Sequence, residues 1–268
     1  CRTLRLDLVC IQSGKMAGNE ERLSIKPTDV GSLVDEGLFV FWVVDGAFQR
    51  SMNKQGMMAL LMDIARSPGD VVKDIREIAD QVMTTMAQGV SAGAHGIILA
   101  DDIAYHQGTY MAPGFVEQFL LPIWQMYVKT AKGLGVPVFF HSDGNLNTVL
   151  PNIVSAGFDG LQCIEPAAGM SMSKIRQQYG KDRCLMGNVD PALLSDQSGH
   201  GNAELGYDEL RRAVTDLMAP TVGRGGFIFG SCSGLHTGMW PERVNYMYQL
   251  ATELDRAACC YDSLSYSY

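Results

Sequence analysis

The sequence has no surplus of basic residues: 21 lysines and arginines face 29 aspartates and glutamates, giving a formal net charge of -8. Sequence-independent binding to nucleic acid or to an anionic membrane needs basic surface that neutralises phosphates, so both partners are excluded. The chain also has no apolar run of about 18 residues and no signal-peptide pattern, so neither a membrane span nor export is predicted. We expect a cytoplasmic protein whose ligand is a small molecule.

Cysteine patterns and nucleotide-binding glycines are missing as well. The seven cysteines have neither the spacing of a disulfide framework nor a CxxC zinc pattern, which predicts reduced thiols. No GxGxxG turn is present, which disfavours a dinucleotide-binding sheet. Core material, by contrast, is abundant: 47% of the 268 residues are hydrophobic, enough for a single globular domain over residues 1–268.

Short apolar runs alternate with helical patterns along the whole chain. Strands are predicted at 4–9, 38–44, 96–100, 138–140, 160–165, 184–190 and 226–232. Helices are predicted to begin near residues 26, 68, 113, 147, 170, 207 and 241. Strands that alternate with helices pair in parallel, so the pattern predicts an α/β fold.

Polar residues follow most of these strands. In a (β/α)₈ TIM-type barrel, the carboxyl ends of the strands form the catalytic face, and polar strand ends are expected all round it. An open doubly wound sheet is the competing fold, but its site would draw on fewer strands. The stretch 137–145 is the clearest case, because an apolar strand ends there in His141, Asp143 and Asn145.

Four segments resemble one known family. They are His141-Ser-Asp143-Gly144-Asn145, Ala156-Gly157-Phe158-Asp159-Gly160 running on to Glu165-Pro166, Gly187-Asn188-Val-Asp190-Pro191, and Gly225-Gly226-Phe-Ile. Over about residues 25–257 the chain is similar to the uroporphyrinogen decarboxylase superfamily, which also contains cobalamin-dependent methyltransferases. The resemblance implies a (β/α)₈ barrel that is incomplete at the amino end, because members are usually longer there. Residues 1–24 and 258–268 are then atypical ends.

Individual positions resemble the methyltransferase branch more closely. Its members typically hold zinc with a His-x-Cys pair at one strand end, a glutamate one strand on, and a cysteine after the last strand. His141, Glu165 and Cys232 fall at these places, and Asp143 replaces the first cysteine. The resemblance therefore implies zinc held by His141, Glu165 and Cys232, with an open position that binds a thiol and lowers its pKa.

Several features of the decarboxylase branch are replaced or missing. The arginine-rich amino-terminal segment that binds pyrrole acetates is not found, and Ser233-Gly234 stands where decarboxylases have His-Gly. Met52 is the nearest match to their site tyrosine. Asp143-Gly144, however, resembles the Asp-Gly pair that decarboxylases carry, so this pair keeps both chemistries open.

Further side chains at strand ends complete the candidate site. Those predicted to act in catalysis are Asp143, Asp101 and Asp102, and those predicted to bind substrate are Asn145, Asn188, Asp190 and Ser233. Each residue could instead have a structural role. His141 could be a hydrogen-bonded core histidine, and Cys232 a buried thiol. Asp101, Asp102, Glu165 or Asp190 could cap a helix, and Asp143 could brace His141. The sequence leaves both kinds of role open for each residue.

The leading hypothesis is zinc-dependent methyl transfer between a methylated corrinoid and a thiol or folate acceptor. No Asp-x-His-x-x-Gly segment of the kind that ligates cobalamin is present, so the resemblance implies methylcobalamin carried by a separate corrinoid protein. A homodimer stays open. The alternatives are decarboxylation of a porphyrinogen or related carboxylate, with Asp101, Asp102 or Asp143 stabilising a protonated ring, and a non-catalytic barrel fragment.

Overall fold

The computed structural model describes residues 4, 6–12, 27–180, 182–195, 203–220 and 225–265. They belong to two compact units, Cys1–Gln162 (unit 1) and Cys163–Tyr268 (unit 2). Most of the two expected atypical ends, 1–24 and 258–268, lies outside the described residues or side chains. Within the described part of the chain, no helix is both long enough and apolar enough to cross a membrane.

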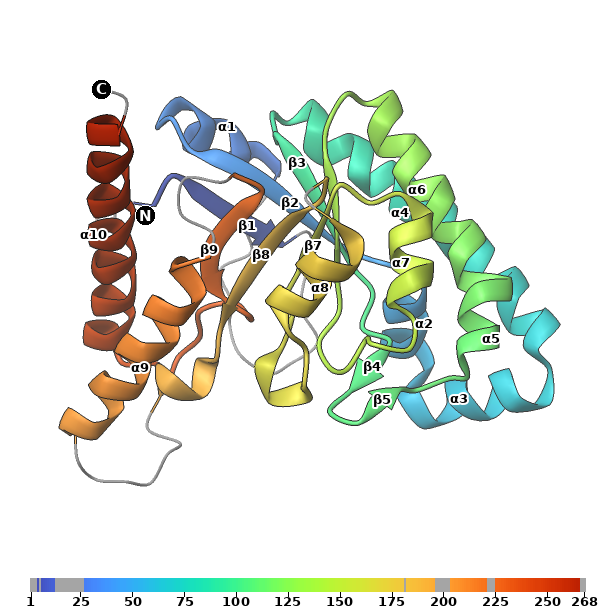
Figure 1. Ribbon diagram of the computed structural model, residues 1–268. Helices are drawn as coiled ribbons and strands as arrows, with labels where there is room; N and C mark the ends of the chain where they lie inside the picture. Colours follow the sequence, from blue (N-terminus) through green and yellow to red (C-terminus); the bar gives the residue numbers. More distant parts are fainter. Residues whose placement is uncertain are drawn as a thin grey trace. The chain divides into compact units, whose positions relative to one another are not determined.

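Unit 1 is built on parallel strands in the order β1, β2, β3, β6, β7 (Figure 1). These strands are β1 (Leu8–Gln12), β2 (Phe39–Asp45), β3 (Gly96–Ala100), β6 (Val138–His141) and β7 (Gly160–Gln162). The register sets Asp45 beside Ala100, and Ala100 beside His141. His141 in turn pairs with Gln162. The carboxyl ends of these strands therefore lie along one edge of the sheet.

The remaining elements of unit 1 connect and cover these strands. The helices are α1 (Pro27–Asp35), α2 (Ala47–Gln55), α3 (Met57–Arg66), α4 (Pro68–Ser91), α5 (Pro113–Phe115), the π-helix η1 (Val116–Leu120), α6 (Leu121–Gly133) and α7 (Leu150–Ala156). A small antiparallel hairpin, β4 (Ala104–Tyr105) and β5 (Gly108–Thr109), follows β3. Helices α4 and α6 are adjacent, and α4 packs on β2 (Figure 1).

Burial on both faces of the sheet accounts for the apolar strand sequences. Phe41 and Val44 of β2 point to opposite faces, as do Ile97 and Ile98 of β3, and all four side chains are buried. Helix α4 shows how tightly the helices pack, because a side chain at Gly89 would collide with the ring of Trp42. Such continuous apolar strands are typical of parallel sheets covered by helices.

Unit 2 contains two parallel strands, β8 (Cys184–Val189) and β9 (Phe227–Ser231), paired along their length. Its helices are η2 (Pro166–Ala168), α8 (Met172–Tyr179), η3 (Pro191–Leu193), α9 (Ala203–Met218) and α10 (Pro241–Ser265). Helices α9 and α10 contact each other. The buried guanidinium of Arg243 lies 4.4 Å from the ring of Trp240, and it donates to the carbonyls of Leu193 and Ser195.

The mixed α/β class and the incomplete barrel are confirmed. Most predicted strands form at the expected positions, but β1 occupies Leu8–Gln12 and not 4–9. Helices α2 and α3 and the β4–β5 hairpin were not predicted from the sequence. The single domain over 1–268 stays a prediction, since the chain divides into two compact units.

Candidate functional site

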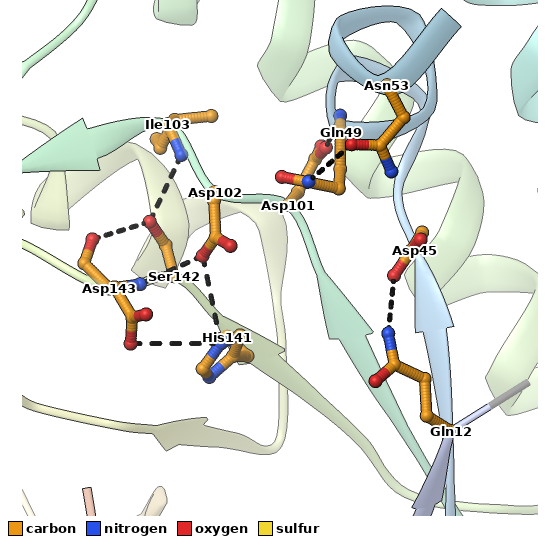
Figure 2. A network of polar contacts seen from close by, with 10 residues as sticks. All are labelled: Gln12, Asp45, Gln49, Asn53, Asp101, Asp102, Ile103, His141, Ser142 and Asp143. Atoms are coloured by element: carbon orange, nitrogen blue, oxygen red, sulfur yellow. Dashed lines mark hydrogen bonds and ion pairs between the residues drawn. The ribbon is translucent and has the colours of Figure 1, made fainter. Parts of the chain in front are cut away.

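The carboxyl ends of β2, β3 and β6 in unit 1 carry a group of polar side chains (Figure 2). We call Asp101, Asp102, His141 and Asp143 the acidic cluster. Because the strands are parallel and in register, residues that lie 40 positions apart in sequence, such as Asp101 and His141, become neighbours. The amide of Asp101 donates to the carbonyl of His141 at 2.9 Å, which continues the sheet pairing one residue beyond β3.

Asp101 is buried, with 1% of its surface exposed. One carboxylate oxygen accepts from the amide of Gln49 in α2 at 2.9 Å, and the other accepts from the indole Nε1 of Trp124 in α6 at 3.1 Å. Burial raises the pKa of Asp101 from 3.8 to about 7, against the opposing effect of these two hydrogen bonds. The carboxylate is therefore enclosed by protein and linked to two helices.

Asp102 and Asp143 both face the imidazole of His141 (Figure 2). His141 Nε2 lies 3.7 Å from Asp102 Oδ1 and 4.0 Å from Asp143 Oδ1. Asp102 Oδ1 also accepts from the amide of Asp143 at 3.0 Å. Ser142, which lies between His141 and Asp143 in the sequence, is buried. Its hydroxyl accepts from the amide of Ile103 at 3.1 Å and donates to the carbonyl of Asp143 at 2.9 Å. The loops after β3 and β6 are thus cross-linked.

The other ring nitrogen of His141 has a different environment. Nδ1 is buried and has no hydrogen-bond partner among the residues that the structure describes. A buried polar atom without a partner costs about 1–3 kcal/mol, so such atoms are rare and often mark the place of a ligand or ion. The imidazole therefore has carboxylates at one nitrogen and an unsatisfied second nitrogen.

A further carboxylate, Asp45, ends β2 next to this cluster. It accepts from Gln12 Nε2 of β1 at 3.1 Å (Figure 2). Burial raises the pKa of Asp45, while the hydrogen bond from Gln12 and the charge of Arg50 oppose the rise. Arg50 donates to the carbonyl of Asp45 at 3.0 Å and to Thr85 at 3.1 Å. Its guanidinium thus bonds within the protein fold.

The β4–β5 hairpin lies against the loop that carries Asp143. The rings of Tyr105 and Tyr110 stack with centroids 5.6 Å apart. Burial, and then the charges of Asp102 and Asp143, raise the pKa of Tyr110. Gly144 has a positive φ of 87°, and a Cβ there would lie 2.6 Å from the amide nitrogen of Tyr105. Only glycine permits this close approach.

Unit 2 carries a second group at its strand ends, which we call the thiol cluster: Cys163, Asn188 and Cys232. Both thiols are buried, and a Cβ on Gly187 would lie 2.7 Å from the carbonyl oxygen of Cys163 and 3.6 Å from Cys232 Cα. Cys163 and Ile164 both adopt positive φ, 88° and 55°. Asn188 Nδ2 donates to the carbonyl of Ile164 at 2.8 Å and so supports this strained turn.

The remaining predicted residues lie in loops. Asp190 Oδ1 accepts from the amide of Ala192 at 2.9 Å and therefore caps η3, the structural role left open by the sequence. Glu165 precedes η2 without a side-chain cap bond. Asn145 Oδ1 accepts from Asn147 at 3.1 Å, and the hydroxyl of Ser233 donates to the carbonyl of Gly234 at 3.5 Å. Roles of these residues in substrate binding stay predictions.

The structure thus brings Asp101, Asp102, His141 and Asp143 together in unit 1. The predicted zinc ligands fall in both units, His141 in unit 1 and Glu165 and Cys232 in unit 2, so this set also stays a prediction. Sequence reasoning missed the contributions of Gln49, Trp124 and Ser142. Ser142 lies inside the recognised His-Ser-Asp segment and was detectable, whereas nothing in the sequence joins Trp124 to Asp101.

Strands that alternate with helices, pair in parallel and end in polar groups define the class of (β/α)₈-barrel proteins, here in an incomplete form. A solved structure of a methyltransferase from Methanosarcina mazei shows the same fold: the TM-score is 0.69 at 19% identity, over 85% of this chain and 62% of that one. Within this class, the chain belongs to the uroporphyrinogen decarboxylase (URO-D) family, whose sequence profile matches residues 50–254.

Curated relatives carry the name uroporphyrinogen decarboxylase. The protein from Crocosphaera subtropica is 23% identical over 201 residues, which are 74% of this chain and 52% of the relative. The protein from Carboxydothermus hydrogenoformans is 27% identical over 180 residues, 66% of this chain and 46% of the relative. The chain therefore spans about half the length of these relatives.

Proposed function

We propose that the protein catalyses zinc-dependent methyl transfer between a methylated corrinoid and a thiol or folate acceptor. The observation that carries this proposal is the environment of His141: carboxylates at Nε2 and a buried Nδ1 without a partner among the described residues. The fold shared with a methyltransferase supports the same branch of the family.

The donor chemistry of unit 1 fits a zinc ligand. Two carboxylates near Nε2 favour a proton on that nitrogen, which leaves the lone pair on Nδ1 as an acceptor. Histidine ligands of metals commonly donate their other ring N–H to a carboxylate, which fixes the tautomer and raises the basicity of the ligating nitrogen. We propose that Asp102 and Asp143, 3.7 Å and 4.0 Å from His141 Nε2, do this when the metal is bound.

The thiol and carboxylate ligands would come from unit 2. Cys232 and Glu165 are the residues named by the family resemblance, and imidazole, thiolate and carboxylate are all ordinary zinc ligands. Cys163 offers another thiol, since it is bonded directly to Gln162, the register partner of His141. Bound zinc would supply a positive charge that lowers the pKa of an acceptor thiol.

The residues of the acidic cluster have separate tasks in this scheme. Asp102 orients His141 and the amide of Asp143. Asp143, whose side chain is 55% exposed, would take the proton that an acceptor thiol releases. In the transfer itself, the new sulfur–carbon bond forms as the cobalt–carbon bond breaks, and the electron pair of that bond stays on cobalt.

Decarboxylation of a porphyrinogen or related carboxylate is the second candidate, and the names of the curated relatives favour it. Here the carboxylates of the acidic cluster would stabilise a protonated ring. The charge pattern of unit 1 counts against it, because Asp45, Asp102 and Asp143 would repel the carboxylates of such a substrate. Arg50 already bonds within the protein. Release of carbon dioxide from uroporphyrinogen without a metal requirement would select this function.

A separate corrinoid protein is the partner that the first proposal requires. Mixing the chain with a methylated corrinoid protein and with free methylcobalamin would show whether the carrier accelerates the reaction.

We also propose that the chain works as a single domain. A homodimer remains one of the open possibilities for its oligomeric state.

Zinc analysis of the purified chain tests the proposal. We expect one zinc ion per chain and thiol-dependent loss of the methylcobalamin spectrum. The variants His141→Asn and Cys232→Ala should lose the zinc and lower the rate at least about 100-fold. Matched controls are His95→Asn, at the opposite end of the unit 1 strands, and Cys184→Ala, at the start of β8. Absence of zinc, or methyl transfer that survives both site substitutions, would overturn the proposal.

A further inference from the structure

Asp101 differs from its neighbours in the acidic cluster because the protein encloses it. Its surface is 1% exposed, and Gln49 and Trp124 donate to its two oxygens. A group that touches substrate or transfers a proton to it must reach it directly or through one water. We infer that Asp101 is a positioning residue, which fixes the direction of Asp102 and, through Asp102, of His141.

Asp101 is bonded to α2 through the amide of Gln49. Gln49 lies in the first turn of α2, where backbone N–H groups have no partner inside the helix. Gly46, the residue before the helix, has no side chain that could cap it, and Asp101, which follows β3, supplies the acceptor instead. A Cβ on Gly46 would lie 2.6 Å from Asp101 Oδ1, so glycine is needed to admit the carboxylate.

Asp101 is also bonded to α6, through the indole of Trp124. Trp124 is fully buried, and its ring packs edge-on against Phe140 of β6 at 4.9 Å between centroids. Its Nε1 is directed at the second oxygen of Asp101. One carboxylate therefore fixes the end of β3 to two helices, in two directions. A side chain held by two hydrogen bonds in a packed interior has little freedom to move.

The backbone of Asp101 connects this anchor to His141. The amide of Asp101 donates to the carbonyl of His141, so the peptide that precedes Asp101 is fixed as well. Asp102 follows directly, accepts from the amide of Asp143 and lies 3.7 Å from His141 Nε2. Removing one of the two donors to Asp101 would therefore change the separation of Asp102 and His141 without replacing any residue of the acidic cluster.

Two matched tryptophan substitutions test the inference. Trp124→Phe removes one donor to Asp101, and Trp42→Phe makes the same change at a buried indole whose Nε1 has no partner among the described residues. Both leave a similar cavity, so both should lower the thermal midpoint. Only Trp124→Phe should shift the imidazole NMR cross-peaks of His141 at constant pH, assigned by their loss in His141→Asn.

Methyl transfer supplies the second readout, and this arm alone rests on the proposed function. We expect Trp124→Phe to lower kcat on the order of ten-fold with little change in KM, and Trp42→Phe to leave kcat near that of the original chain. Equal shifts of the His141 cross-peaks in both variants, or no shift in either, would overturn the positioning role. If the original chain transfers no methyl group, the proposed function fails, and the NMR result still decides the role of Asp101.

Discussion

The two strand-end clusters are built by different means. The acidic cluster of unit 1 contains charged groups that hydrogen bonds from helices and loops hold in place. The thiol cluster of unit 2 contains no carboxylate and depends on unusual backbone conformation, with positive φ at Cys163 and Ile164. Charge and pH should therefore govern the stability of the acidic cluster, whereas backbone strain and the amide of Asn188 should govern that of the thiol cluster.

The largest expected effect concerns the pH dependence of stability through Asp101. Its pKa is raised from 3.8 to about 7 in the folded protein. The stability that this shift contributes is fully present below pH 3.8 and is lost as the pH rises through about 7. Relative to Asp101→Asn, the chain should lose up to about 4 kcal/mol between these limits. Urea unfolding of both metal-free proteins from pH 4 to 8 measures the difference, and a difference independent of pH would contradict the prediction.

The next effect concerns the close packing of the β4–β5 hairpin on the loop of unit 1. Gly144→Ala places a Cβ against the backbone of Tyr105 at positive φ, so we expect a loss of about 3 kcal/mol in the free energy of unfolding. Gly114→Ala is the control, because its site is open and helical. Denaturant melts of the two variants compare them. Equal stabilities would show that the hairpin does not need Gly144.

A smaller effect is expected from the amide that supports the thiol cluster. Asn188→Ala leaves the buried carbonyl of Ile164 without its donor, which should cost about 2 kcal/mol. Asn245→Ala, in the second turn of α10, should change stability by less than about 0.5 kcal/mol. Unfolding of the two variants at constant pH provides the measurement. An unchanged stability in Asn188→Ala would remove the role assigned to this amide.

The elements and their polar ends could be predicted from sequence because apolar strands buried on both faces leave a simple pattern. Strand β3 and the Asp101-Asp102 pair that follows it were located in this way. What the sequence did not reveal is which carboxylate is enclosed. Burial of Asp101 depends on Trp124 and on the missing side chain of Gly46, and both come from other elements of unit 1. The short helices α2 and α3 were not predicted because few of their side chains are buried. In α3, Leu60 is the one buried residue.

We propose that His141 binds a metal through a nitrogen that otherwise has no partner in the described structure. The most direct measurement is the zinc content of the purified chain beside that of His141→Asn and His95→Asn. We expect one zinc ion per chain in the original protein and in His95→Asn, and none in His141→Asn. Zinc retained by His141→Asn, or absent from all three proteins, would contradict it.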